Sequence, residues 1–155
     1  MTKLQRLESL GDLGRRLREE EKILVLANGA FDLLHVGHLR YLQGAAAAGD
    51  YLLVAVNSDA SVRRAKGANR PVVPEAERAE LVAGLGCVDA VIIFDEDRPD
   101  VVIRAFRPHV QAKGTDYRAD EVPEAELMAS IGGNVVIVGD PKDHSTTALV
   151  QRLGK

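Results

Sequence analysis

The most informative part of the sequence is the stretch Asn28-Gly29-Ala30-Phe31-Asp32-Leu33-Leu34-His35-Val36-Gly37-His38. It follows a short apolar run and leads directly into a helical pattern. Gly29 allows a tight turn or the close approach of a ligand to the backbone. A strand that turns into a helix presents free backbone N–H groups and the positive end of the helix dipole, which together bind phosphate. The stretch therefore predicts a phosphate site at the carboxyl end of a buried strand.

The two histidines in this stretch are the candidate chemical groups. His35 and His38 are three residues apart, so a helix that begins near His35 places both imidazoles on one face of its first turn. Gly37, between them, has no side chain that would block access. Imidazoles there can donate hydrogen bonds to phosphoryl oxygens as charge develops. Capping and packing are the structural alternative, and a zinc site is not expected because His-x-x-His supplies only two nitrogens.

On both sides of this stretch, apolar runs alternate with helical patterns along the chain. Several runs are continuous, which is typical of parallel strands covered on both faces. The expected strands are Ile23–Ala27, Tyr51–Val56, Ala90–Phe94, His109–Ala112 and Val135–Val138. The expected helices are His38–Ala48, Glu75–Leu85, Pro99–Phe106, Glu124–Ile131 and Thr146–Leu153. This alternation predicts an α/β fold, a Rossmann-like three-layer sandwich with a five-stranded parallel sheet, whose ligands bind beyond the carboxyl ends of the strands.

Ahead of the first strand, we expect a leader helix over residues 1–21, followed by one domain over residues 22–155. The segment Leu4–Glu21 carries an apolar stripe of leucines at helical spacing. These leucines are Leu4, Leu7, Leu10, Leu13 and Leu17. Because the segment is rich in both signs of charge, we expect it to dock on the domain or on a partner subunit rather than on a membrane surface.

Composition excludes several classes of protein. The 155 residues are 46% hydrophobic and 28% charged, which is typical of a globular protein. A net charge of −3 and 4% aromatic residues argue against nucleic-acid binding. No run approaches the roughly 18 apolar residues of a membrane span, and the charged N-terminus lacks a signal core, so a cytoplasmic location is expected. The single cysteine, Cys87, excludes an intrachain disulfide and a Cys-only zinc site.

The stretch from Asn28 to His38 resembles the signature of the cytidylyltransferase-like nucleotidyltransferase superfamily, whose HxGH motif is His35-Val36-Gly37-His38 here. The resemblance covers residues 22–153 and is strongest to the adenylyltransferase domain of the heptose 1-phosphate pathway. The segments that carry this finer resemblance are Val56–Ser61, Lys66-Gly67, Arg70–Val72, Arg78, Lys113–Tyr117 and Ser145–Thr147. It implies that ATP, or another nucleoside triphosphate, is joined to a sugar 1-phosphate with release of pyrophosphate.

The resemblance also assigns roles to individual residues. It implies that His35, His38 and Lys66 are catalytic and neutralise charge on the phosphates. The residues implied to bind the nucleotide are Asn28, Gly29, Ala30, Phe31, Gly37, Asp116, Ser145, Thr146 and Thr147. The residues implied to bind the acceptor are Asp59, Arg78, Lys113 and Tyr117. Mg²⁺ carried by the phosphates, with no metal site of the protein's own, and a homodimer are implied as well.

Each of these assignments has a structural alternative. Ser145–Thr147 can be an N-cap alone, and Lys113–Tyr117 can be a simple turn. Residues 60–74, which contain Arg63, Arg64, Lys66 and Arg70 and no acid, are expected to form a basic loop, with Lys66 at the ligand edge of the sheet. Arg78 is expected either to contact phosphate or to brace the site.

Two other functions stay open. Related enzymes transfer cytidylyl groups to glycerol 3-phosphate or other alcohol phosphates. They place an Arg-Thr pair shortly before Ser-Thr-Thr, whereas residues 139–144 contain no arginine here. A nucleotide-binding sensor without turnover is the second alternative, and the intact pair of His35 and His38 argues against it.

Overall fold

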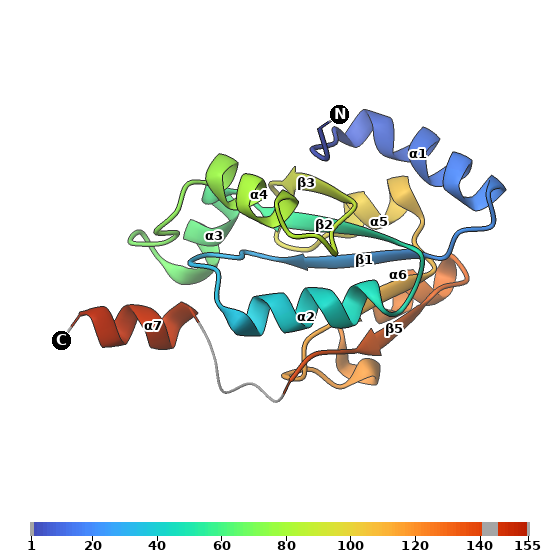
Figure 1. The fold of residues 1–155 in the computed structure, drawn as a ribbon. Coiled ribbons are helices and arrows are strands. Elements are labelled where there is room, and N and C mark those ends of the chain that lie inside the picture. Colours follow the sequence, from blue (N-terminus) through green and yellow to red (C-terminus); the bar gives the residue numbers. More distant parts are fainter. Residues whose placement is uncertain (1, 141–145, 155) are drawn as a thin grey trace.

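The computed structural model describes residues 2–140 and 146–154. Its centre is one parallel sheet with the strand order β3-β2-β1-β4-β5 (Figure 1). The strands are β1 (Leu24–Gly29), β2 (Tyr51–Asn57), β3 (Ala90–Phe94), β4 (Val110–Lys113) and β5 (Asn134–Ile137). All five predicted strands are confirmed, with ends that shift by a residue or two. The strand order reverses direction at β1, so a crevice is expected where β1 and β4 part.

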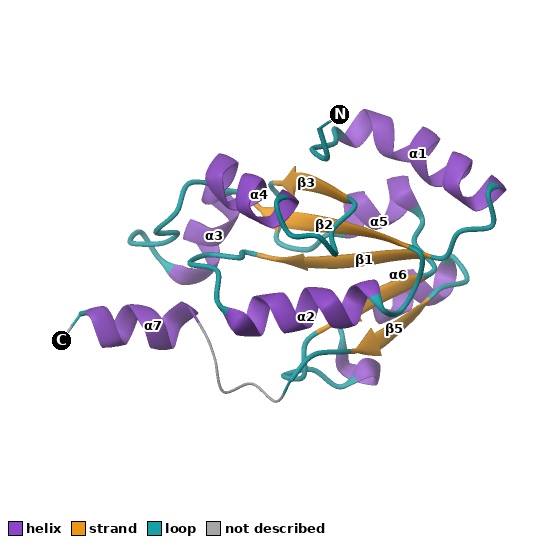
Figure 2. Cartoon of the chain, in the orientation of Figure 1, coloured by secondary structure: helices purple, strands orange, loops and turns teal. Residues whose placement is uncertain are grey.

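Helices cover both faces of this sheet (Figure 2). One core lies between the sheet and the helices α2 (Val36–Ala46) and α4 (Glu75–Ala83), and it includes Val25 and Ala27 of β1. The opposite core includes Leu24 and Leu26, together with side chains of α1 (Leu7–Glu19), α5 (Asp100–Phe106) and α6 (Ala125–Ser130). Because alternate β1 residues enter opposite cores, the strand is apolar throughout. The predicted three-layer sandwich is confirmed.

The helix α3 (Asp59–Lys66) was not predicted from the sequence. The prediction of a basic loop over residues 60–74 is therefore wrong for its first half, and Lys66 ends a helix. Ser58 caps the helix by accepting a hydrogen bond from the backbone N–H of Ser61 at 3.1 Å. Ser58 and Asp59 at the start, the basic last turn and Gly67 after it are the helix signals that the charge-rich composition concealed.

The other helices predicted after the first strand hold to within two residues at each end, whereas the leader helix predicted over residues 1–21 covers only Leu7–Glu19. The C-terminal helix α7 covers Thr146–Leu153, as predicted, and the short 3₁₀ helix η1 (Ala119–Glu121) precedes α6. Among the helices that the structure describes, none is both long and apolar enough to cross a membrane.

The leader helix α1 packs on α5 and joins the same core as the rest of the sheet. Leu10, Leu13 and Leu17 are buried in it. The expected stripe is wrong at its start, because Leu4 lies before the helix, bridged to Val91 of β3, and is 49% exposed, while Leu7 is 40% exposed. The first residues thus extend the sheet beside its edge strand β3.

Candidate active site

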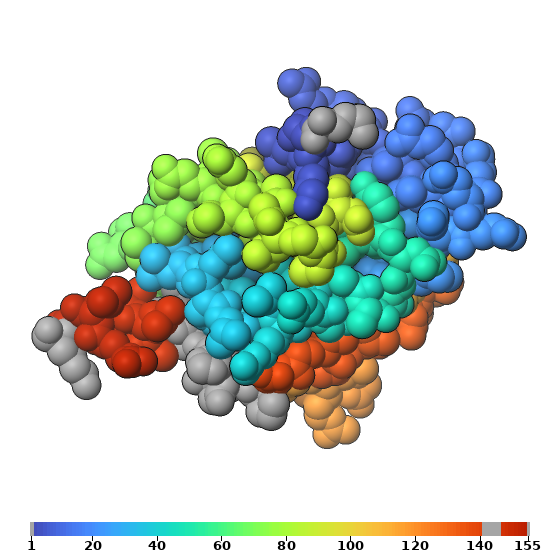
Figure 3. All heavy atoms as spheres, viewed as in Figure 1, coloured from blue at the N-terminus to red at the C-terminus, as the bar shows by residue number. Residues whose placement is uncertain are grey.

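A cavity of about 530 Å³ lies at the carboxyl edge of the sheet. The ends of β1, β2 and β4, the first turn of α2 and the last turn of α3 form its walls. Figure 3 shows α7 next to the start of α2, and Thr147 of α7 lines the same cavity. The predicted site residues that the structure brings together here are Asn28, Gly29, Ala30, Phe31, His35, Gly37, His38, Lys66, Lys113, Asp116, Tyr117 and Thr147.

The two histidines form the N-terminal cap of α2. His35 is the N-cap, and its Nδ1 accepts a hydrogen bond from the backbone N–H of Gly37 at 3.1 Å. His38 Nδ1 accepts from the backbone N–H of His35 at 3.2 Å, and the ring centroids lie 3.9 Å apart. A nitrogen that accepts a hydrogen bond carries no proton, so both rings carry their proton on Nε2. Capping and phosphate binding are thus compatible, because the cap uses Nδ1 and the donor atom of each ring is Nε2.

The loop between β1 and α2 is held in an unusual backbone conformation. Phe31 and Leu33 have φ of 53° and 48°, values that bulky residues rarely adopt. Between them, Asp32 is 1% exposed and accepts hydrogen bonds from the backbone N–H groups of Val72 and Val73 at 2.8 and 2.9 Å. This buried carboxylate fastens the histidine loop to the segment that follows α3. Phe31 as a whole is 3% exposed, and the centroid of its ring lies 6.3 Å from that of Tyr41.

The electrostatic balance at Asp32 favours the charged carboxylate. Burial on its own raises the pKa of Asp32, but the hydrogen bonds from Val72 and Val73, with Arg70, outweigh it. Arg70 Nε lies 3.3 Å from Asp32 Oδ2. The net result is a pKa below the usual value for aspartate.

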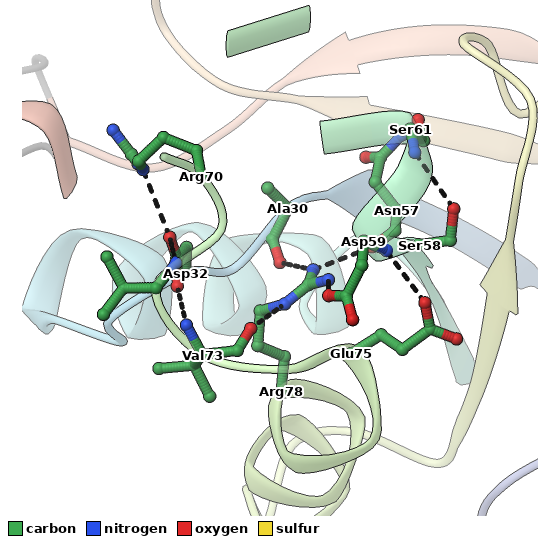
Figure 4. A network of polar contacts seen from close by, with 11 residues as sticks. Ala30, Asp32, Asn57, Ser58, Asp59, Ser61, Arg70, Val73, Glu75 and Arg78 are labelled. Carbon is green, nitrogen blue, oxygen red and sulfur yellow. Dashed lines mark hydrogen bonds and ion pairs between the residues drawn. The ribbon is translucent and has the colours of Figure 1, made fainter. Parts of the chain in front are cut away.

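Arg78 braces the carboxyl edge of the sheet (Figure 4). Its guanidinium is 0% exposed and donates to the carbonyl oxygens of Val73, Ala30 and Asn57 at 2.8, 2.6 and 2.7 Å. It also pairs with Asp59 Oδ1 at 2.8 Å. Of the two roles left open by the sequence, the structure gives Arg78 the bracing one. Neither Arg78 nor Asp59, both predicted to meet the acceptor, is among the described residues that line the cavity.

Lys113, the last residue of β4, and Tyr117, four residues further on, line the cavity together. Lys113 Nζ lies 3.2 Å from Glu124 Oε1 and 5.1 Å from the centre of the Tyr117 ring. Burial, together with the charges of Asp116 and Glu124, raises the pKa of Tyr117. Its phenol therefore keeps its proton at neutral pH and can donate a hydrogen bond.

Comparison with known proteins identifies the family to which this site belongs. A family model described as cytidylyltransferase-like matches residues 26–152. The chain belongs to the cytidylyltransferase-like family. The resemblance inferred from the HxGH stretch is thereby confirmed, and the cavity is the candidate active site of a cytidylyltransferase-like nucleotidyltransferase.

Relatives within this group are similar along nearly the whole chain. The bifunctional protein HldE of Geotalea uraniireducens is 47% identical over 151 residues, which cover 97% of this chain and 31% of that protein. The protein of the same name from Streptomyces coelicolor is 49% identical over 142 residues, covering 92% and 31%. The chain thus spans about a third of these relatives' length. A lipopolysaccharide core biosynthesis protein from Thermoplasma volcanium superposes with a TM-score of 0.69 at 28% identity, covering 78% of this chain and 99% of that one.

Tyr41 is a residue of this cytidylyltransferase-like site that sequence reasoning missed. β1 and β4 pair as far as Ala27 and Ala112. Beyond this pair, the Tyr41 hydroxyl donates to the Ala112 carbonyl at 2.6 Å and accepts from the Asn28 N–H at 3.4 Å. Tyr41 therefore bridges the two strands where they part, and only the strand order reveals this role.

Residues after β2 and β3 were also missed as cavity walls. They are Asn57, Ser61, Asp97 and Arg98. Arg98 donates to the Pro123 carbonyl at 2.9 Å and thus links the end of β3 to the segment before α6. A systematic search of the positions that follow each predicted strand would have found Asp97 and Arg98.

The predicted Ser145–Thr147 group is only partly described. Ser145 lies outside the described residues, and Thr146 is described only as the first residue of α7. Thr147 lines the cavity at the N-terminal end of α7, and the free backbone N–H groups of a helix N-terminus are able to bind phosphate.

Proposed function

We propose that the chain joins ATP to D-glycero-D-manno-heptose 1-phosphate, giving a nucleotide-activated heptose and pyrophosphate. One observation carries the chemistry: the stacked pair of His35 and His38, whose Nδ1 atoms accept the hydrogen bonds of the helix cap, lines the cavity at the N-terminus of α2. The same cavity contains Lys66 and the start of α7. These groups suit the phosphates of a nucleoside triphosphate.

In the proposed reaction, a phosphate oxygen of the acceptor attacks the α-phosphorus of the nucleotide in line. The bond from the α-phosphorus to the bridging oxygen breaks, and pyrophosphate leaves. No nucleophile of the protein is needed, because the acceptor is already an oxyanion. Catalysis is therefore alignment together with stabilisation of the charge that develops on the phosphates, which we assign to His35, His38 and Lys66.

We propose further that Mg²⁺ enters with the triphosphate. Three carboxylates at the cavity are already engaged: Asp32 with backbone N–H groups, Asp140 with Arg40, and Glu124 with Lys113. Such groups are poor candidates for a dedicated metal cage, and Mg²⁺ readily takes phosphate oxygens and water instead. When bound, the ion supplies charge neutralisation on the phosphates.

The choice of substrates is supported by the HldE relatives and by the Lys113–Tyr117 segment at the cavity. The test is a matrix of four nucleoside triphosphates against heptose 1-phosphate, glycerol 3-phosphate, phosphocholine and FMN, scored by pyrophosphate release. ATP with heptose 1-phosphate is expected to give the highest kcat/KM. A better result with glycerol 3-phosphate would overturn the heptose assignment, a better result with CTP the adenylyl assignment, and nucleotide binding without pyrophosphate would indicate a sensor.

A homodimer and a cytoplasmic location complete the proposal. Both come from the sequence resemblance and composition. Sedimentation velocity should give a mass twice that of one chain, and a single-chain mass across the accessible concentration range would exclude the dimer. Fractionation of cells that express the native protein tests the location.

A further inference from the structure

At one corner of the cavity, three lining polar residues, Asn28, Lys113 and Glu124, meet Gln111, which lies behind them. Gln111 and Lys113 lie on β4, Asn28 lies on β1, and Glu124 immediately precedes α6. Gln111 is 0% exposed, Glu124 2% and Lys113 7%. We refer to these four residues as the β4 corner. Such deeply buried polar groups are retained only where they are paired with each other or with a ligand.

The hydrogen bonds within the β4 corner converge on one oxygen of Glu124. Glu124 Oε1 lies 3.2 Å from Lys113 Nζ and 3.2 Å from Gln111 Nε2. Gln111 Nε2 also lies 3.4 Å from Asn28 Oδ1. Because both of these neighbours are acceptors, the nitrogen and not the oxygen of the Gln111 amide must face them.

Two acceptor atoms are left over by this arrangement. Within residues 2–140 and 146–154, Glu124 Oε2 and Gln111 Oε1 are buried and have no hydrogen-bond partner. Buried polar atoms are nearly always bonded, so a missing partner points to a group that occupies the site in the working protein. Glu124 lines the cavity, whereas Gln111 is not among the described lining residues, so a ligand in the cavity can supply the partner of Glu124 Oε2. Because this atom is an acceptor, the ligand group must be a donor. An ionised phosphate offers only acceptors and would be repelled by Glu124, so phosphate does not fit here.

We propose that the β4 corner binds a sugar hydroxyl of the substrate, with Glu124 as the specificity-determining residue. A hydroxyl donates and accepts at once, so it can donate to Glu124 while accepting from Lys113. Glu124 lines the cavity, and the torsion that turns its carboxylate is soft, so the spare oxygen can rotate to the cavity wall. The inference rests on the proposed function, whose sugar phosphate and nucleotide ribose are the two sources of such hydroxyls.

The β4 corner then complements the phosphate-binding end of the cavity. In the β4 corner, the charge of Glu124 offsets that of Lys113, so the corner offers no net positive charge to a phosphate. His35, His38 and Lys66 provide the donors for phosphate elsewhere in the same cavity. One substrate with a charged end and a hydroxyl end would thus be bound in a single orientation.

The deciding variant is Glu124→Gln, which keeps the size of the side chain and replaces an acceptor oxygen with an NH₂ donor. Binding of ATP with Mg²⁺ and of heptose 1-phosphate is measured separately by titration calorimetry. The affinity for one of the two should fall about tenfold to a hundredfold, the range for a lost hydrogen bond to a charged group. Glu126→Gln makes the same chemical change at an exposed position of α6 and should change neither affinity.

Deoxy analogues distinguish the two sources of the hydroxyl. If it belongs to the ribose, 2′-deoxy-ATP or 3′-deoxy-ATP binds more weakly than ATP to the wild type but not to Glu124→Gln. If it belongs to the acceptor, the same pattern is found with deoxy forms of heptose 1-phosphate. Unchanged affinities for both substrates in Glu124→Gln would overturn the inference.

An assay of turnover tests the proposed function, and the binding titrations test the role of Glu124 independently. A wild type that releases no pyrophosphate contradicts the proposed function, whereas the titrations judge Glu124 without any turnover. Should thermal melts show that Glu124→Gln does not fold, Glu124→Asp keeps the negative charge near Lys113 and withdraws the carboxylate by one methylene. The same loss of affinity is expected for it, and unchanged affinities would again overturn the inference.

Discussion

At the scale of single residues, the site depends on how each polar atom is used. His35 and His38 illustrate this, because Nδ1 of each ring accepts a hydrogen bond of the helix cap, and Nε2 of each ring carries the proton. A histidine that only capped the helix would leave chemistry unaffected when replaced by another cap. Because the cap uses Nδ1 and the proposed phosphate contact uses Nε2, the two roles of each histidine can be tested separately.

Replacing either histidine by asparagine should separate the two roles. Asparagine is a good N-cap, so the thermal stability of His35→Asn should stay close to that of the wild type. Its kcat should nevertheless fall by about 10²–10³, the usual cost of one lost donor to a developing charge. His38→Asn is expected to lower kcat to a similar degree, with a smaller effect on the KM for the nucleotide. Near-normal kcat in both variants, measured by pyrophosphate release, would contradict the catalytic assignment.

Asp32 predicts how stability depends on pH. Its pKa is lower in the folded protein than in the unfolded chain, so the charged carboxylate stabilises the fold above the unfolded value of about 3.9. That contribution is lost as the pH falls through the lower, folded value. Asp32→Asn should therefore reduce the free energy of unfolding at pH 7 and flatten its decline in acid.

Urea unfolding between pH 2 and 7 measures this effect. The matched control is Asp12→Asn, whose side chain is 85% exposed and pairs with Arg15 on the outer face of α1. It should leave the pH profile nearly unchanged. Parallel profiles of Asp32→Asn and the wild type would show that the buried carboxylate has no role in acid sensitivity.

At the scale of elements, the packing of α1 on α5 depends on a close approach at one glycine. A Cβ atom at Gly14 would lie 2.4 Å from the carbonyl oxygen of Phe106, whereas at Gly11 the nearest atom is 3.9 Å away. Arg18 Nη1 donates to the same Phe106 oxygen at 2.8 Å. Gly14 therefore lets the helix backbone reach the end of α5, where a larger residue would separate them.

The two glycines provide a matched pair of variants. Gly14→Ala should destabilise the protein by about 1–3 kcal/mol, as expected for overpacking. Gly11→Ala should be neutral or stabilise it by up to about 1 kcal/mol, because alanine is the better helix former. Thermal melts should show opposite shifts in Tm, or a loss for Gly14→Ala alone. Equal shifts would mean that α1 is not fixed against α5.

At the scale of the whole molecule, Arg78 joins segments that are far apart in the sequence. Its guanidinium connects the loop after β1, the end of β2, the start of α3 and the segment before α4 (Figure 4). The wall of the cavity therefore depends on one buried cation that does not itself line it. The histidine loop is fastened to the same segment by Asp32.

Arg78→Met is expected to destabilise the protein by about 3–5 kcal/mol, because the variant leaves Asp59 and three carbonyl oxygens without their donor. For a chain of this size, this corresponds to a fall in Tm of very roughly 6–20 °C. Arg104→Met, at an exposed position of α5, is the control and should change Tm by little. A small shift in both variants would show that the four segments are held together by other contacts.

The sequence by itself determined the α/β class, all five strands, the HxGH turn and the cavity edge. These features are local. Short patterns in the sequence indicate which faces are buried and where the chain turns, namely apolar runs, a glycine turn and helical spacing. It failed for α3, where a helix in which half of the residues are charged lacks the apolar periodicity that signals one.

Only the tertiary structure decided the polar framework around the cavity. Asp32 meets Val72, Arg78 meets Ala30, and Gln111 meets Asn28 across 40, 48 and 83 positions of sequence. No local pattern records such pairs, since they depend on the strand order, which sets β2 on one side of β1 and β4 on the other. The same order buries Glu124 against Lys113, and so creates a site for hydroxyls from residues that look like ordinary surface charges in the sequence.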